Sequence, residues 1–118
     1  ICQASPKEHD EAVSLISHLP IFLASALIET VHTKNNQSLL DLTQKLAATG
    51  FTDTSRVGGG NEQLALDLAM NNQINVLNAI NIFKNKLNRL ESLIKEKNWE
   101  LLFEKLSESK EIREKFID

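Results

Sequence analysis

The chain has 118 residues, of which 42% are hydrophobic and 25% charged, and its formal net charge is −3. This length suits one domain, and the composition is that of an ordinary globular protein. The acidic balance provides no basic surface for nucleic acid or anionic lipid, and no apolar run reaches the roughly 18 residues that cross a bilayer. We therefore expect a cytoplasmic domain with neither a nucleic-acid nor a membrane partner.

The first residues of the sequence and its single cysteine bear on the kind of protein and on the compartment in which it works. The chain begins "ICQASPKEHD", without a methionine, which indicates a piece of a longer protein. Cys2 is the only cysteine, which excludes an internal disulfide and a CxxC metal motif. A single cysteine is typical of a reducing compartment.

The first predicted helix has a clear start. In "SPKE", Ser5 is the expected N-cap, Pro6 the first helical residue, and Glu8 the partner that completes a capping box. Apolar residues then recur at helical spacing as far as Val31. Pro20 interrupts this pattern and predicts a kink near "SHLP" without ending the helix, because the apolar stripe keeps its phase beyond it.

The remaining helices are predicted from the residues at their ends. The stretch "SLLDLTQKLAAT" predicts a short helix that Gly50 ends in a left-handed conformation, and "GFTDTSRVGGGN" is the one stretch predicted not to be helical. Asn61 is the expected N-cap of a helix over "EQLALDLAMNN", and a long amphipathic stretch, "QINVLNAINIFKNKLNRLESLIKEKN", follows. Asn98 caps a last helix, and the charged end "SESKEIREKFID" is expected to fray.

The pattern as a whole predicts an all-α fold of five or six helices, two of them long. Two long apolar faces are more than so few helices can cover, and a homodimer with long helices packed across a two-fold axis would cover them. A monomeric bundle fits these observations equally well. The larger apolar side chains of the second half are expected in the core or at an interface: Met70, Phe83, Trp99 and Phe103.

Arg56 is the first candidate for a functional residue. Its guanidinium is a planar fork of donors that matches a carboxylate or a phosphate, and hydroxyl residues precede it. Asp53 could hold Arg56 or cap the turn, and the alternative is that Arg56 is solvated or structurally paired. The three glycines that follow lack the G-x-G-x-x-G spacing and no predicted strand precedes them, so we expect no nucleotide-binding loop.

Histidine provides the second candidate. His18 lies at the expected kink, where a proline can turn a side chain into a cleft, and Ser17 could reach the same cleft. The alternative is a half-buried histidine bonded to a backbone carbonyl. His9 and Asp10 form an "HD" pair, but no second ligand cluster accompanies them and no metal site is expected.

Several of these motifs occur together in one known family. The segments "SPKEHDEAVSLISHLP", "LAATGFTDTSRVGGGNEQLALDLAMNN" and "LIKEKNWELLFEKL" resemble, in this order, the C-terminal domain of prephenate/arogenate dehydrogenases. The likeness runs from Ser5 to about Arg113. The ending "SRVGGGN" looks most like the cyanobacterial members, which mostly prefer arogenate and NADP.

The resemblance implies a fold, a reaction and partners. The fold is a helical dimerisation domain similar to the C-terminal domain of 6-phosphogluconate dehydrogenase, and residues 1–118 would form it as a homodimer. The reaction is the oxidative decarboxylation of arogenate or prephenate in tyrosine biosynthesis. NADP or NAD would be bound by an N-terminal Rossmann domain that these residues do not include. The catalytic histidine belongs to that domain too, so we expect no catalytic, cofactor-binding or metal residue here and an inactive fragment.

The resemblance also implies site residues. Arg56 would grip a substrate carboxylate, and His18, with Ser17 beside it, would line the same pocket. Asp53 would position the segment that carries Arg56. The corner formed by Thr49 and Gly50 would approach the end of the ligand that differs between prephenate and arogenate.

Two departures from the family pattern favour arogenate. Many prephenate-type members carry a tryptophan after the glycine segment, where this chain has Leu64 and Ala65. A histidine often follows "SHLP", where this chain has Ile21. Two other functions stay open: a stand-alone helical interaction module without catalysis, and the helical domain of another Rossmann-type dehydrogenase that acts on a different carboxylate.

Overall fold

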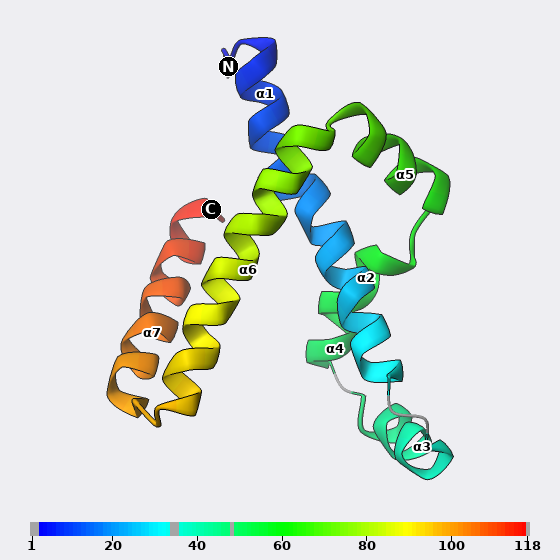
Figure 1. Ribbon diagram of the computed structural model, residues 1–118, viewed down its shortest axis with the longest axis vertical. Helices are drawn as coiled ribbons and strands as arrows, with labels where there is room; N and C mark the ends of the chain where they lie inside the picture. Colours follow the sequence, from blue (N-terminus) through cyan, green and yellow to red (C-terminus); the bar gives the residue numbers. More distant parts are fainter. Residues whose placement is uncertain (1–2, 34–35, 48, 118) are drawn as a thin grey trace. The chain divides into compact units, whose positions relative to one another are not determined.

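The structure is a computed structural model that describes residues 3–33, 36–47 and 49–117 (Figure 1). The described residues form helices and no strand, which confirms the all-α prediction. The chain divides into two compact units, Ile1–Ile80 and Asn81–Asp118, and the division falls within helix α6 (Gln73–Lys95). Cys2 lies outside the described residues.

The first unit opens with the helix that the capping box predicts. Helix α1 (Pro6–Val13) starts after Ser5, whose hydroxyl accepts a hydrogen bond from the Glu8 amide at 3.1 Å. The Glu8 carboxylate in turn accepts one from the Ser5 amide at 3.1 Å. These two reciprocal bonds satisfy amides at the helix start that have no intrahelical partner. The predicted start is confirmed to the residue.

The helix passes Pro20 without stopping, as predicted, and its irregularity is a π turn. Helix α1 leads into η1 (Ser14–His18), a π-helical segment, and then into α2 (Leu19–His32). The Leu19 amide donates to the Ser14 carbonyl, five residues back. A π turn inserts one extra residue into a helix, and such turns are frequent at functional sites. It lies one turn before Pro20, which lacks the amide of a regular helix.

The stretch around residue 50 corrects the sequence-based prediction. Helix α3 (Gln37–Leu46) is capped by Asn36, and residues 49–59 then form α4 (Thr49–Ser55) and the 3₁₀ helix η2 (Arg56–Gly59). The prediction of a non-helical segment is therefore wrong. Gly50 lies in the first turn of α4, and no described glycine has a positive φ, so its expected left-handed role is wrong too. Intrinsic propensity disfavours a helix here, and packing against α2 overrides it.

The first unit ends with α5 (Glu62–Asn71) and the beginning of α6. Asn61 caps α5 as predicted, because its side-chain oxygen accepts from the Leu64 amide at 3.0 Å. Helix α5 packs against the π turn η1, and η2 and α4 pack against α2. The chain segments that the sequence separates therefore meet around α2 (Figure 1).

The second unit is the rest of α6 followed by α7 (Trp99–Phe116). Lys97 adopts a left-handed conformation with φ of 58° between the two helices. Asn98 donates from its amide to the Leu93 carbonyl and caps α7 with its side chain, as predicted. Helix α7 runs through the charged end to Phe116, so the expectation of fraying there is wrong.

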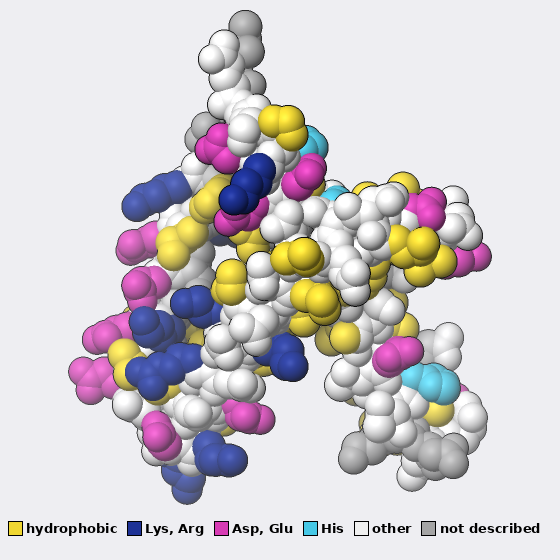
Figure 2. Space-filling model, turned by 45° about the horizontal axis from the view of Figure 1, so that its top comes forward, with side chains coloured by type: hydrophobic (Ala, Val, Ile, Leu, Met, Phe, Trp, Pro, Cys, Tyr) yellow, Lys and Arg dark blue, Asp and Glu magenta, His cyan; other side chains and the backbone are white. Residues whose placement is uncertain are grey.

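Neither unit buries much apolar surface. Among the described residues, few hydrophobic side chains are buried, and two of them are alanines: Ala24, Val76 and Ala79 in the first unit and Leu93 in the second. Met70, Trp99 and Phe103 are each more than half exposed, which excludes them from the core of their own unit and leaves the interface alternative as a prediction. Figure 2 shows many hydrophobic side chains open to solvent on the displayed face. Apolar surface on this scale is typical of an interaction surface.

The first helical run meets a membrane-span criterion by length and composition alone. Residues Pro6–His32 form 27 consecutive helical residues, and an 18-residue window of them has a mean hydropathy of 1.7. The sequence-based estimate counted only uninterrupted apolar residues. The core helix of a soluble protein and a signal sequence near the N-terminus pass the same test, and this run carries Ser14, His18 and Pro20 within it. The absence of a membrane partner stays a prediction.

Candidate functional site

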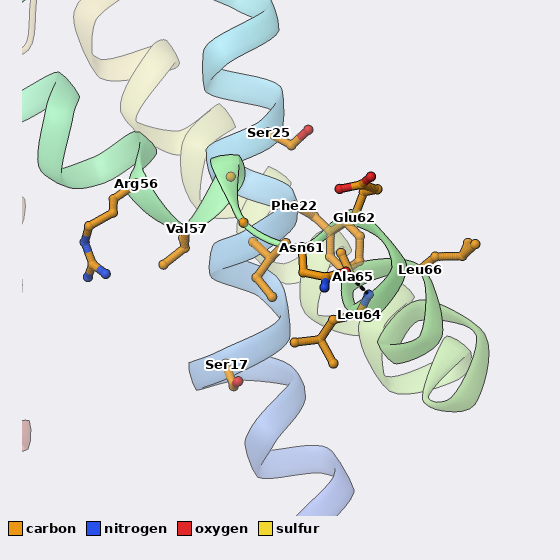
Figure 3. Close-up of a pocket in the computed structure, with 13 residues that line it drawn as sticks. Ser17, Phe22, Ser25, Arg56, Val57, Asn61, Glu62, Leu64, Ala65 and Leu66 are labelled. Atoms are coloured by element: carbon orange, nitrogen blue, oxygen red, sulfur yellow. Dashed lines mark hydrogen bonds between the residues drawn. The ribbon is translucent and has the colours of Figure 1, made fainter.

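A groove of about 630 Å³ runs between α2 and the segment that follows α4. Ser17, Ile21 and Ser25 lie along one wall at a spacing of four residues, which places them on one face of the helix. Phe22 stands next to them. The opposite wall comes from the segment between Arg56 and Leu66 (Figure 3). The groove is therefore built from two parts of the chain about 40 residues apart in sequence.

Gly58 makes this wall possible. A Cβ atom on Gly58 would lie 2.8 Å from the backbone carbon of Ala24 and 2.8 Å from the backbone nitrogen of Ser25. Real Cβ atoms essentially never come so close, and Ala24 itself is fully buried. The sequence prediction assigned the glycines to a close approach between backbone and ligand. In the structure, Gly58 permits a close approach between η2 and α2.

Helix α5 begins at the groove. The Asn61 cap and Glu62, the first helical residue, both line it, together with Leu64 and Ala65. The amide end of a helix carries a partial positive charge and favours an anion, whereas the Glu62 carboxylate opposes one. The walls combine apolar side chains with a few polar groups. Such a lining suits a small organic ligand with an apolar body and a charged group.

Arg56 stands at one end of the groove. It is the first residue of η2, its side chain is exposed, and it lines the groove. Within the described part of the chain it forms no ion pair and donates no side-chain hydrogen bond. In Figure 3 its guanidinium extends away from Phe22 and Glu62. The guanidinium is therefore available to a ligand at the edge of the groove, and it is not locked inside the fold.

The structure separates the other predicted residues. Ser17 lines the groove with Arg56, whereas Thr49, Gly50 and Asp53 are exposed on α4 and do not line it. Among the described contacts Asp53 forms no ion pair with Arg56 and accepts no capping hydrogen bond. The two interpretations offered for Asp53 therefore find no support in the recorded contacts. The reason is that Asp53 lies within the helix α4, whereas both interpretations assumed a turn or loop at this position.

His18 is buried and does not line the groove. Only 7% of its surface is exposed, and its Nδ1 atom lies 3.3 Å from Nδ2 of Asn72. The same Asn72 nitrogen donates to the backbone carbonyl of Asp10 at 2.8 Å. The alternative in which His18 bonds a backbone carbonyl is not observed, because its recorded partner is a side chain. Sequence reasoning missed Asn72, since nothing local distinguishes it from its neighbour Asn71.

The other ionisable groups show little that suggests catalysis. His9 and Asp10 form an exposed pair at 3.4 Å, and the described residues contain no group of three or more His, Cys, Asp or Glu side chains that could hold a metal. Hydrogen bonds from the Ser5 backbone and then from its side chain hold the pKa of Glu8 below its usual value. Glu8 lies at the start of α1, where it stabilises the helix.

The described residues therefore form a helical domain with many exposed apolar side chains and a groove edged by an arginine. Residues 5–108 match the family described as "Prephenate dehydrogenase, dimerization domain". The chain belongs to this family. The resemblance found in the sequence motifs is thereby confirmed.

Solved structures agree with this family. The chain is similar to Synechocystis arogenate dehydrogenase, with a TM-score of 0.94 and 38% identity over 97% of this chain and 41% of that one. It is also similar to prephenate dehydrogenase from Aquifex aeolicus, solved with hydroxyphenyl propionate and NAD+. The TM-score there is 0.85 and the identity 33%, over 98% of this chain and 39% of that one.

Among curated proteins, the chain is 26% identical to Bacillus subtilis prephenate dehydrogenase over 112 residues. That alignment covers 95% of this chain and 30% of the relative. The chain thus spans about a third of the length of such relatives. It corresponds to their dimerization domain, and the relatives are oxidoreductases.

Proposed function

We propose that this chain is the dimerisation and substrate-binding domain of an NAD(P)-dependent dehydrogenase that converts arogenate or prephenate by oxidative decarboxylation. The family membership supports this, and so does the similarity to an arogenate and a prephenate dehydrogenase. The observation that carries the ligand part is Arg56, a guanidinium without a recorded partner at the end of a partly apolar groove. It fits a ring-bearing acid, whose carboxylate the arginine would orient.

The nicotinamide cofactor would be bound outside this chain. The described residues form no strand, and Gly58 is packed against α2 where a phosphate-binding loop would need open backbone. The residues present therefore do not fit the cofactor. Their own part is to bind the substrate and to pair two subunits. A separate nucleotide-binding domain of the same cytoplasmic enzyme would provide the redox chemistry.

The homodimer is part of this proposal. The scarcity of buried apolar residues in each unit supports it, because the exposed faces need a partner surface. The family is described as a dimerization domain, which supports a second copy of the chain as that partner. Sedimentation of the complete protein should give twice the mass of one chain. A monomer at micromolar concentration would contradict this part.

Arogenate with NADP is the proposed preference. Leu64, Ala65 and Ile21 stand where prephenate-type members of the family carry tryptophan and histidine, and all three line the groove. The structural similarity to Synechocystis arogenate dehydrogenase points in the same direction.

The experiment that tests this function is a steady-state comparison on the complete protein. Arogenate and prephenate are each assayed with NADP and with NAD, and kcat/KM is determined for the four combinations. The proposal predicts turnover, with the highest kcat/KM for arogenate with NADP. No turnover of either substrate with either cofactor would overturn the dehydrogenase assignment. A preference for prephenate or for NAD would overturn only the specificity.

A further inference from the structure

Asn72 links three segments of the first unit through one side chain. It lies between α5 and α6, and its Nδ2 atom lies 2.8 Å from the carbonyl oxygen of Asp10 and 3.3 Å from Nδ1 of His18. Its Oδ1 atom accepts a hydrogen bond from Nδ2 of Asn75 at 2.9 Å. All these groups belong to the unit Ile1–Ile80.

These contacts determine which way the Asn72 amide points. A backbone carbonyl can only accept a hydrogen bond, so the Asn72 atom that faces Asp10 must be the nitrogen. The bond from Asn75 to the Asn72 oxygen agrees with this orientation. An amide whose two ends are otherwise hard to distinguish is therefore oriented by its neighbours.

The amide orientation determines the tautomer of His18. An Asn NH₂ group has two hydrogens and no acceptor, so the one directed at His18 makes Nδ1 the acceptor. In the neutral ring the proton then resides on Nε2. No buried side-chain nitrogen or oxygen of the described residues lacks a partner, and the recorded partner of His18 is at Nδ1.

We propose that Asn72 is a positioning residue that holds His18 as its Nε2–H tautomer and so fixes the π turn that carries Ser17 into the wall of the groove. The ligand part rests on the proposed function. Ser17, the preceding residue of the same π turn, lines the groove. A purely structural Asn72 would tie α1 to the α5–α6 junction and would leave the ring free to carry its proton on either nitrogen.

The first test measures the tautomer by NMR in the complete protein labelled with ¹⁵N-histidine. Loss of a signal in His18→Gln assigns the ring. The proposal predicts an unprotonated Nδ1 and a protonated Nε2 in the wild type. Asn72→Asp replaces the donor with an acceptor, so Nδ1 should become protonated. Asn71→Asp adds the same charge one residue away and should leave both signals unchanged.

Each outcome of this test bears on the proposal. A protonated Nδ1 in the wild type overturns it, and so does an Nδ1 signal that Asn72→Asp does not move. If Asn72→Asp does not fold, Asn72→Ala replaces it, and its ring signals should shift toward an average of the two tautomers. Unshifted signals in Asn72→Ala overturn the proposal as well. The wild-type spectrum is decisive even if neither variant folds.

The second test separates the tautomer from the ligand. In the same complete protein, Asn72→Ala should raise KM for the carboxylate substrate about tenfold and change kcat much less, since the π turn that places Ser17 in the groove is no longer held. Asn71→Ala should leave KM unchanged. A KM that Asn72→Ala leaves unchanged, together with the predicted tautomer, overturns the ligand part alone. Absence of any turnover in the wild type overturns the dehydrogenase assignment and leaves the NMR result standing.

Discussion

The backbone of Gly58 lies so close to α2 that a Cβ atom there would meet the backbone carbon of Ala24 at 2.8 Å. This contact brings η2 onto α2 and shapes one wall of the groove. Gly59, the next residue, has open space around its hypothetical Cβ. Two adjacent glycines therefore offer a matched pair of substitutions with opposite expected effects.

Gly58→Ala should destabilise the protein by about 1–3 kcal/mol, because the added methyl group forces two backbones apart. Gly59→Ala should be neutral or stabilise by about 0.4–1 kcal/mol, since its φ is not positive and the space is free. Urea unfolding of both variants measures the two free energies. Equal effects of the two substitutions would show that η2 does not pack on α2 in this way.

Arg56→Ala in the complete protein should raise KM about 10- to 100-fold, because it would remove the proposed charge-assisted hydrogen bond to the substrate carboxylate. The melting temperature should stay the same, since Arg56 is exposed and has no recorded partner. Arg113→Ala removes an exposed arginine from α7 and is the matched control. Steady-state kinetics with arogenate and prephenate measure the effect, and an unchanged KM in Arg56→Ala would count against the proposed carboxylate site.

Lys97→Gly should stabilise the second unit by up to about 1 kcal/mol. Lys97 has a φ of 58°, and the amides of Lys97 and Asn98 bond the carbonyls of Ile94 and Leu93 in the pattern that ends helices at a left-handed residue. A side chain in this conformation is strained, whereas glycine is not. Thermal unfolding measures the gain. Lys86→Gly lies inside α6 and should destabilise by a similar amount. A lower melting temperature in Lys97→Gly would contradict the geometry.

Glu8 should make the stability of the protein depend on pH at the acidic end. The hydrogen bonds from Ser5 lower the pKa of Glu8 below its ordinary value of 4.5. A lowered pKa in the folded state contributes stability that is present above that value and is lost as the pH falls through the lowered pKa. Glu8→Gln should therefore reduce the melting temperature at about pH 7, and the difference should shrink toward about pH 3.

Thermal unfolding across this range measures the effect of Glu8. Glu11→Gln removes the same charge from the same helix without touching the cap, and it is the control. A difference between Glu8→Gln and the wild type that grows as the pH falls would contradict the capping box in solution.

Local chemistry explains which predictions succeeded. The caps at Ser5, Asn61 and Asn98 were predictable because each cap bonds an amide three residues away. The helices α4 and η2 were not, since a glycine-rich segment has low helix propensity and becomes helical through packing on α2. The left-handed conformation of Lys97 was missed too, because no sequence signal marks a lysine that adopts it.

The sequence by itself determined the all-α class, the helix starts and the family, because capping and apolar periodicity act over a few residues and the family motifs can be recognised as text. Arg56 was also found there, as a cation among hydroxyl residues. Only the tertiary structure decided that Ser17 and Arg56 line the same groove while Asp53 does not line it. It alone paired His18 with Asn72, 54 residues away. Contacts at such separation depend on how whole helices pack, which no local pattern specifies.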